Sequence, residues 1–207
     1  MSAKKYSVIV FDLGNVLIPF NYDTALQKLD KIDPGLGKKF WEYYKNNYEI
    51  HRSFERGDLP EEEFIRTMLE SVENRIDRDT FCRYYSEIFT VNEDVASLLP
   101  ELKKKYMLVL LSNTNSIHRE YGWKDYDFLS HFDKLILSHE VNSVKPEEKI
   151  YKSVEDFTNK PPQEHLFIDD VHDYVEGAKK LGWDAVQFKS YQQLLGDLKE
   201  RGILEAE

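Results

Sequence analysis

Five short apolar runs divide the chain, and each is continuous rather than alternating with polar residues. They cover residues 7–11, 107–111, 135–137, 166–168 and 185–188. Continuous runs of this length are typical of strands covered on both faces. Helical spacing of apolar residues predicts helices over Val95–Tyr106 and Asp173–Leu181, the second closed by Gly182. Strands that alternate with helices predict an α/β fold with a parallel sheet.

The segment from Phe20 to Asn92 interrupts this alternation. It holds no convincing strand, and its many aromatic residues lie on helical pieces. One helix start is marked by Leu59–Pro60 and the three acids that follow, because proline and acids favour a first helical turn. We expect an inserted all-helical cap domain at residues 19–92, with residues 1–18 and 93–207 forming the catalytic core.

Composition fits a globular chain of 207 residues, with 41% hydrophobic and 32% charged residues. A single cysteine, Cys82, cannot form an internal disulfide, so we expect a reducing, cytoplasmic location. Met1 to Lys5 run into an apolar segment without a cleavage site, so no signal peptide is expected. The longest apolar runs are far shorter than the roughly 20 residues of a membrane helix.

The formal net charge of −10 restricts the partners. A negative field disfavours nonspecific binding to nucleic acid or to an anionic membrane. A phosphate site in such a chain needs its own local positive charge, from a metal, a lysine or backbone N–H groups.

Polar residues follow the predicted strands where each strand ends. Asp12 follows the first, Ser112 the second, and Asp169 with Asp170 the fourth, while Lys145 lies in the loop after the third. Singly, each has an ordinary interpretation as a turn, cap or surface residue. Because the carboxyl ends of parallel strands share one edge, we expect these side chains to converge there. Clustered carboxylates without histidine or cysteine partners favour a hard cation, and Mg²⁺ fits best.

Four segments resemble, in order, the motifs of the haloacid dehalogenase superfamily. They read FDLGNV at 11–16, LSNTN at 111–115, VKP at 144–146 and FIDD at 167–170. The resemblance covers nearly the whole chain and implies a Rossmann-like core with a helical cap. Residues 55–59, ERGDL, resemble a segment often seen in such caps. The first two motifs are similar to those of a bacterial subgroup that includes an α-glucose-1-phosphate phosphatase.

The resemblance also implies roles for the converging residues. Asp12 would attack phosphorus and form an aspartyl-phosphate. Asp12, the Gly14 carbonyl and Asp170 would bind Mg²⁺, with Asp169 doing so directly or through water. The remaining implied roles belong to the phosphate and to the surroundings of the metal. Ser112, the Asn113 backbone and Lys145 would hold the phosphate of a small phosphorylated metabolite, and Asp173 would support the metal ligands.

One position departs from the family pattern. Phosphatases of this superfamily normally carry an aspartate two residues after the nucleophile, which protonates the leaving group. This chain has Gly14, which offers no proton. General acid–base help contributes typically 10²–10⁴-fold, so the loss matters.

Three hypotheses address Gly14. The leaving group could need little protonation, as in a sugar 1-phosphate. Another acid could substitute, with Asp23, His51 and Glu55 as candidates. The reaction could instead be carbon–halogen cleavage, although the Asp169–Asp170 pair has no obvious use there.

Other classes remain open at this stage. A catalytically weak protein could retain the fold and bind a phosphometabolite or a protein partner. A receiver domain would carry its acid pair after the first strand, and a dinucleotide enzyme would need a glycine-rich turn there. We take His51 and Arg52 of the cap as candidates for contacting substrate, together with Tyr48 of the cap and His118 of the core.

Overall fold

The computed structural model describes residues 6–205, so the segment Met1–Lys5, on which the expectation of no signal peptide rests, lies outside it. A five-stranded parallel sheet has the order β3-β2-β1-β4-β5. All five apolar runs form its strands, which are β1 (Val8–Phe11), β2 (Met107–Ser112), β3 (Lys134–Leu137), β4 (His165–Asp169) and β5 (Asp184–Gln187). The predicted α/β class is confirmed.

Strand register aligns the residues that follow the strands. Phe11 pairs with Leu110 of β2 on one side and with Ile168 of β4 on the other. Asp12 therefore leaves the sheet level with Asp169, and its backbone N–H still donates to the Ile168 carbonyl at 2.9 Å. The strand order reverses at β1, and the crevice beside such a reversal is where open α/β sheets bind ligands.

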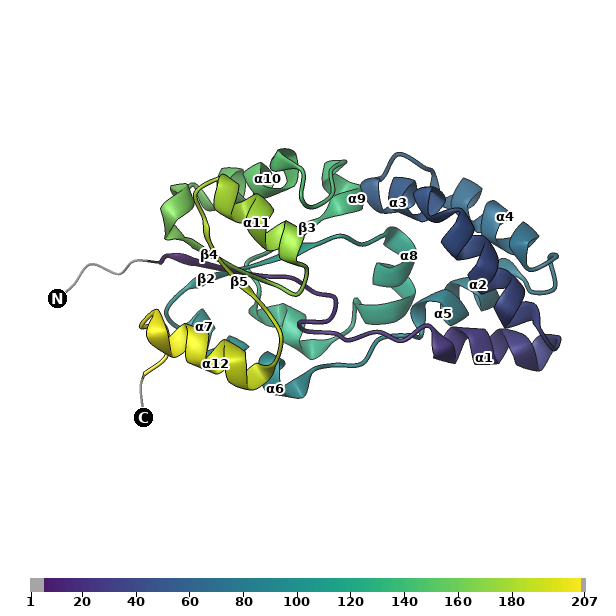
Figure 1. Ribbon diagram of the computed structural model, residues 1–207, viewed down its shortest axis with the longest axis horizontal. Coiled ribbons are helices and arrows are strands. Elements are labelled where there is room, and N and C mark those ends of the chain that lie inside the picture. Colours follow the sequence, from purple (N-terminus) through teal and green to yellow (C-terminus); the bar gives the residue numbers. More distant parts are fainter. Residues whose placement is uncertain (1–5, 206–207) are drawn as a thin grey trace.

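Helices cover both faces of the sheet (Figure 1). Val8 and Val10 pack into one apolar cluster with α10 and α11, whereas Ile9 and Phe11 pack into another with α7 and α12. The core helices are α6 (Glu93–Ala96), α7 (Leu99–Lys103), α8 (Ser116–His118), α9 (Ser138–Val141), α10 (Glu148–Thr158), α11 (His172–Lys180) and α12 (Tyr191–Glu200). Short π and 3-10 turns are η1 (Arg119–Trp123), η2 (Asp127–His131) and η3 (Pro162–Glu164).

Two helix predictions had different outcomes. Asp173–Leu181 matches α11, and Gly182 follows it at a φ of 91°, where the Gly182 and Trp183 N–H groups donate back to the last turn. The single helix expected over Val95–Tyr106 is wrong, because α6 and α7 are separate. Pro100 lies in the first turn of α7, and a proline there cannot continue a preceding helix.

Five helices lie together beyond the carboxyl ends of the strands (Figure 1). They are α1 (Asp23–Ile32), α2 (Leu36–Asn46), α3 (Tyr48–Arg56), α4 (Glu61–Ser71) and α5 (Arg78–Ser86). They share an apolar cluster, which includes the free thiol of Cys82 and also Ile117 of α8, and the predicted helical insertion is confirmed. The two connecting segments pair in antiparallel fashion at Phe20 and Phe89. We call these five helices the cap.

No helix between residues 6 and 205 is long and apolar enough to cross a membrane.

Candidate active site

A buried lysine joins two carboxylates at the carboxyl edge of the sheet. The Lys145 ammonium lies 2.7 Å from Asp12 Oδ1 and 2.6 Å from Asp169 Oδ2. It also donates to the Leu111 carbonyl at 3.2 Å, which uses its third proton. All three charged side chains are buried, and Lys145 and Asp169 are 1% and 0% exposed. The convergence predicted for these residues is therefore present.

The electrostatics of this group are strongly coupled. Burial raises the pKa of Asp12 to about 8, with Lys145 opposing and Asp169 adding to the shift. Burial alone would lower the pKa of Lys145, but the carboxylates of Asp12 and Asp169 raise it above its ordinary value. The rings of Phe167 and Tyr174 lie 5.5 and 5.2 Å from the ammonium, which adds a cation–π contribution. Lys145 is thus held as a cation whose charge the acids require.

Asp170 is held differently from Asp169. Both oxygens of Asp169 accept hydrogen bonds, one from Lys145 and one from the Val171 N–H at 2.8 Å. Asp170 is half-buried and accepts from Asn15 Nδ2 at 3.1 Å. Burial raises the pKa of Asp170, with the Asn15 hydrogen bond opposing. Asp170 therefore keeps one oxygen more accessible than either oxygen of Asp169.

Asn15 is a site residue that the sequence analysis did not single out. Its φ of 56° lies in the left-handed region, which asparagine tolerates better than most residues. This turn follows Asp12 directly and aims the Asn15 amide at Asp170. The available signal was an asparagine directly after the glycine of the first motif.

Ser112 and Asn113 end β2 beside the lysine. The Ser112 side chain is buried. The Asn113 side chain accepts from the Lys145 N–H at 2.8 Å and donates to the Lys145 carbonyl at 3.2 Å. Its amide thus fixes the backbone of the Lys145 loop, where the peptide bond to Pro146 is cis. The backbone of Asn113 is left for the phosphate role that the sequence analysis expected.

The donor set fits a hard divalent cation. Asp12, Asp169 and Asp170 each offer a carboxylate oxygen, and these three atoms lie within 4.8 Å of one another. Oxygen-only ligands suit Mg²⁺. The Gly14 carbonyl already accepts from the Val16 N–H at 2.7 Å and retains a second lone pair. Asp173 is not part of this cluster, since it lies exposed on α11 beside a separate cavity of about 460 Å³, and its supporting role stays a prediction.

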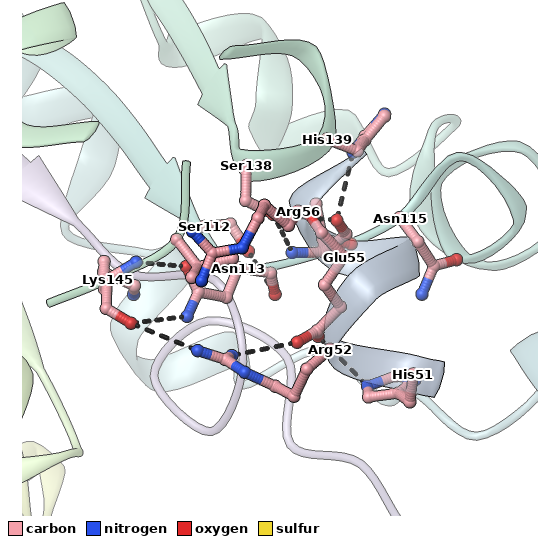
Figure 2. Close-up of polar contacts among 12 residues, drawn as sticks. His51, Arg52, Glu55, Arg56, Ser112, Asn113, Asn115, Ser138, His139 and Lys145 are labelled. Carbon is pink, nitrogen blue, oxygen red and sulfur yellow. Dashed lines mark hydrogen bonds and ion pairs between the residues drawn. The ribbon is translucent and has the colours of Figure 1, made fainter. Parts of the chain in front are cut away.

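One cap helix reaches the Lys145 loop (Figure 2). From α3, Arg52 donates to the Lys145 carbonyl at 3.4 Å and to Glu55 Oε2 at 3.1 Å. His51 Nε2 lies 3.2 Å from Glu55 Oε1. Burial opposes ionisation of Glu55, but His51 and Arg52 overcome it and lower its pKa. Glu55 is therefore a carboxylate whose two oxygens are held by neighbouring cations or donors.

The end of α3 docks closely on the core, which accounts for the ERGDL segment. Gly57 has a φ of 81°, and a Cβ there would lie 2.5 Å from the His139 carbonyl oxygen. Ser138 donates its hydroxyl within reach of the Glu55 and Thr114 carbonyls, at 2.6 and 2.9 Å, and accepts from the Thr114 N–H. Only glycine at position 57 allows the end of α3 to come this close to the core. Ser138 joins the cap to the core, and the sequence analysis did not single it out.

None of the three substitute acids is presented to Asp12 with a spare proton. Asp23 is exposed at the start of α1. Both nitrogens of His51 are engaged, Nδ1 with the Tyr85 hydroxyl at 2.8 Å and Nε2 with Glu55. Glu55 has a lowered pKa. The acid-substitution hypothesis thus finds no contact in its favour in this conformation.

Comparison with known proteins agrees with this geometry. The family profile described as haloacid dehalogenase-like hydrolase matches residues 9–188. A D-ribitol-5-phosphate phosphatase of Bacteroides thetaiotaomicron is 26% identical over 86% of this chain and 90% of its own. A phosphorylated carbohydrates phosphatase of Thermotoga maritima is 25% identical over 86% and 82%.

Solved structures give the same result. A HAD family enzyme from Bacteroides thetaiotaomicron superposes with a TM-score of 0.81 at 26% identity, covering 93% of this chain and 99% of that one. That enzyme in complex with magnesium and inorganic phosphate superposes with a TM-score of 0.77 at 26% identity over 91% and 98%. The profile match covers most of the chain, and the chain belongs to the haloacid dehalogenase-like hydrolases.

Proposed function

We propose that this protein is a Mg²⁺-dependent phosphatase that hydrolyses a small phosphorylated carbohydrate through Asp12. The observation that carries the proposal is the Lys145 ammonium held between Asp12 at 2.7 Å and Asp169 at 2.6 Å, with Asp170 beside them. This places a fixed positive charge and three carboxylates where an anionic substrate and a cation can meet. The similar phosphatases, and the related structure with magnesium and phosphate, support the same assignment.

Asp12, Asp170 and the Gly14 carbonyl are the proposed metal ligands. Asp170 has the more accessible oxygen, so we assign it direct binding and assign Asp169 chiefly to Lys145. Bound Mg²⁺ supplies charge neutralisation for the transferring phosphoryl group.

Asp12 acts as the nucleophile in the proposed reaction. Lys145 holds Oδ1, which leaves Oδ2 to attack phosphorus. The bond from phosphorus to the substrate oxygen breaks, and the alkoxide departs while the phosphoryl group stays on Asp12. Water then attacks phosphorus, releases inorganic phosphate and restores the carboxylate. Splitting the displacement in two lowers each barrier.

The leaving group must depart with little help from position 14. Since Gly14 offers no proton, substrates with more acidic leaving groups should react faster, and a sugar 1-phosphate is one such substrate. The carbon–halogen alternative lacks support, because it gives no role to the Asp169–Asp170 pair. We also propose a reducing, cytoplasmic location, because Cys82 is a buried free thiol. Burial raises the pKa of this thiol to about 11.

Initial rates test the proposal on an aryl phosphate, glucose 1-phosphate and glucose 6-phosphate, with Mg²⁺ or EDTA. We expect turnover that needs Mg²⁺, falls as the leaving group becomes less acidic, and drops by about 10⁴-fold or more in Asp12→Asn. Turnover that survives Asp12→Asn would reject Asp12 as the nucleophile. Mg²⁺ binding without turnover on any phosphate would favour a binding module.

A further inference from the structure

A cavity of about 310 Å³ lies between the cap and the core. Besides its two histidines, six aromatic side chains form much of its wall, namely Phe20, Tyr22, Trp41, Tyr44, Tyr48 and Phe89. Its polar lining consists of His51, Glu55 and His118. Small-molecule sites have volumes of roughly 300–1,000 Å³ and combine aromatic walls with a few placed polar groups. This cavity has that composition and is at the small end of the range.

Two contacts connect the cavity to the catalytic edge. A Cβ on Gly14 would lie 3.4 Å from the Phe20 ring, so Phe20 forms both cavity wall and cover for position 14. On the other side, Glu55 binds Arg52, which binds the Lys145 carbonyl (Figure 2). A phosphate held at Asp12 would therefore place the rest of its molecule beside this cavity.

The side chains that line the cavity range from exposed to buried. Phe20 and Tyr48 are 42% and 45% exposed. Tyr44 and His118 are only 5% and 6% exposed. Exposed aromatic rings beside a hollow offer faces against which C–H groups of a ligand can pack.

A chain of hydrogen bonds fixes the proton on His118. Asn115 Oδ1 accepts from the His118 backbone N–H at 2.9 Å, so its Nδ2 must donate. Nδ2 lies 3.4 Å from the Tyr85 hydroxyl and 3.3 Å from His118 Nδ1. His118 Nδ1 is therefore an acceptor, and the ring proton lies on Nε2.

This Nε2–H has no hydrogen-bond partner among residues 6–205, although it is buried. Burial, with His51 adding, lowers the pKa of His118 to about 3, and the opposing effects of Glu55 and the Tyr85 backbone are smaller. The ring is thus a neutral donor at physiological pH. An unpaired buried donor costs roughly 1–3 kcal/mol in proteins, so its retention beside a cavity needs an explanation.

We propose that this cavity binds the polyhydroxylated carbon chain of the substrate, with His118 Nε2–H donating to one of its hydroxyl oxygens. The inference rests on the proposed phosphatase function for the phosphate end. The C–H groups of such a chain pack on the aromatic wall, and its hydroxyl protons can be accepted by Glu55. His118 is thereby a specificity-determining residue.

The lining discriminates against other ligand classes. The Glu55 carboxylate repels a second phosphate or a carboxylate on the ligand. A plain alkyl chain would leave the His118 donor unpaired. The volume of about 310 Å³ favours a small carbon chain over a nucleotide. A sugar or sugar-alcohol monophosphate satisfies all three conditions.

A matched pair of substrates tests the proposal, a five-carbon sugar-alcohol phosphate and n-pentyl phosphate, which lacks the hydroxyls. We expect the wild type to prefer the sugar-alcohol phosphate in kcat/KM. His118→Phe should lower that preference by roughly tenfold or more, while His118→Gln, which keeps an N–H donor, should retain most of it.

An unchanged preference in His118→Phe would overturn the proposal. If His118→Phe fails to fold, Tyr48→Ala decides, because this exposed wall residue should raise KM for both chain substrates and leave the melting temperature unchanged. Equal KM values in Tyr48→Ala and wild type would count against the cavity. Should turnover be absent, the dissociation constants of the same pair for Asp12→Asn, with and without His118→Phe, test the cavity separately from the phosphatase function.

Discussion

Polar groups are hydrogen-bonded differently at the catalytic edge, where Asp12, Lys145 and Asp169 meet, and in the cavity between the cap and the core. At the edge, Lys145 donates all its protons to partners in the protein, and both oxygens of Asp169 accept. In the cavity, the network through Asn115 and Tyr85 ends on a His118 donor that has no partner among the described residues. The edge is complete except for a cation and phosphate. The cavity is incomplete until a ligand supplies an acceptor.

The difference shows where chemistry and selection come from in this fold. The carboxylates of the edge lie at or directly after the ends of β1 and β4, so the sheet positions them, and the loop after β3 and α9 brings Lys145 to them. The cavity is assembled from the helical cap and from α8, so its shape depends on how the cap packs. We therefore expect changes at the edge to affect stability and every substrate, and changes in the cavity to affect the choice among substrates.

The largest effect should follow replacement of Lys145, whose ammonium is buried at the catalytic edge. Lys145→Met would leave Asp12 and Asp169 buried without their partner, and breaking a buried pair in this way costs about 3–5 kcal/mol. Urea unfolding in EDTA measures this loss, with Lys180→Met, at an exposed residue of α11, as the matched control. Equal stability of the two variants would show that the edge does not depend on Lys145.

Adding Mg²⁺ should have the next largest effect, because it supplies the charge that the edge lacks. At a concentration 100 times its dissociation constant, a ligand of the folded state adds about 2.7 kcal/mol. For a chain of this size, the melting temperature should rise by roughly 5–10 °C. Asp170→Asn should reduce the rise, whereas His118→Phe should leave it intact. An equal rise in Asp170→Asn would remove Asp170 from the metal site.

Acid should destabilise the protein through the cavity. His118 has a pKa of about 3 when folded and 6.5 ordinarily, so the unfolded state binds more protons between these values. The free energy of unfolding therefore falls as pH falls through this window, by about 2–3 kcal/mol from pH 6.5 to 4.5 for this group. Unfolding at both pH values should show a shallower dependence in His118→Phe. Identical slopes would contradict a buried neutral His118.

The smallest effect should come from Gly14→Ala. The Cβ would make ordinary contact with the Phe20 ring at 3.4 Å, and the carbonyl proposed for the metal would remain. We expect a stability change of less than about 1 kcal/mol and a rate within about twofold of wild type. Loss of Mg²⁺-dependent turnover in Gly14→Ala would show that position 14 cannot carry a side chain. Neither the geometry of the edge nor that of the cavity predicts this result.

The sequence predicted the edge better than the cavity for a physical reason. Asp12, Ser112 and Asp169 follow continuous apolar runs, and parallel strands bring such positions together whatever the loops do. The contributions of Asn15 and Ser138 could not be predicted, because they act through hydrogen bonds between segments distant in sequence. Pro100 could have indicated the break between α6 and α7, but the prediction followed the helical spacing of the apolar residues.

The cavity shows the same limit. His51 and His118 were candidates for contacting substrate on composition alone. His51 has a partner at both ring nitrogens, whereas His118 has one at Nδ1 only. This difference follows from the packing of α3 against α5 and α8. The proposed preference of His118 for a hydroxyl, and the cover that Phe20 places over Gly14, depend on tertiary packing and have no local sequence signature.

Intact-mass spectrometry of acid-quenched protein during Mg²⁺-dependent turnover tests the central claim most directly. We predict a transient adduct of one phosphoryl group, mapped by peptide analysis to Asp12 and absent from Asp12→Asn. An adduct on another residue, or steady turnover by Asp12→Asn without any adduct, would contradict it.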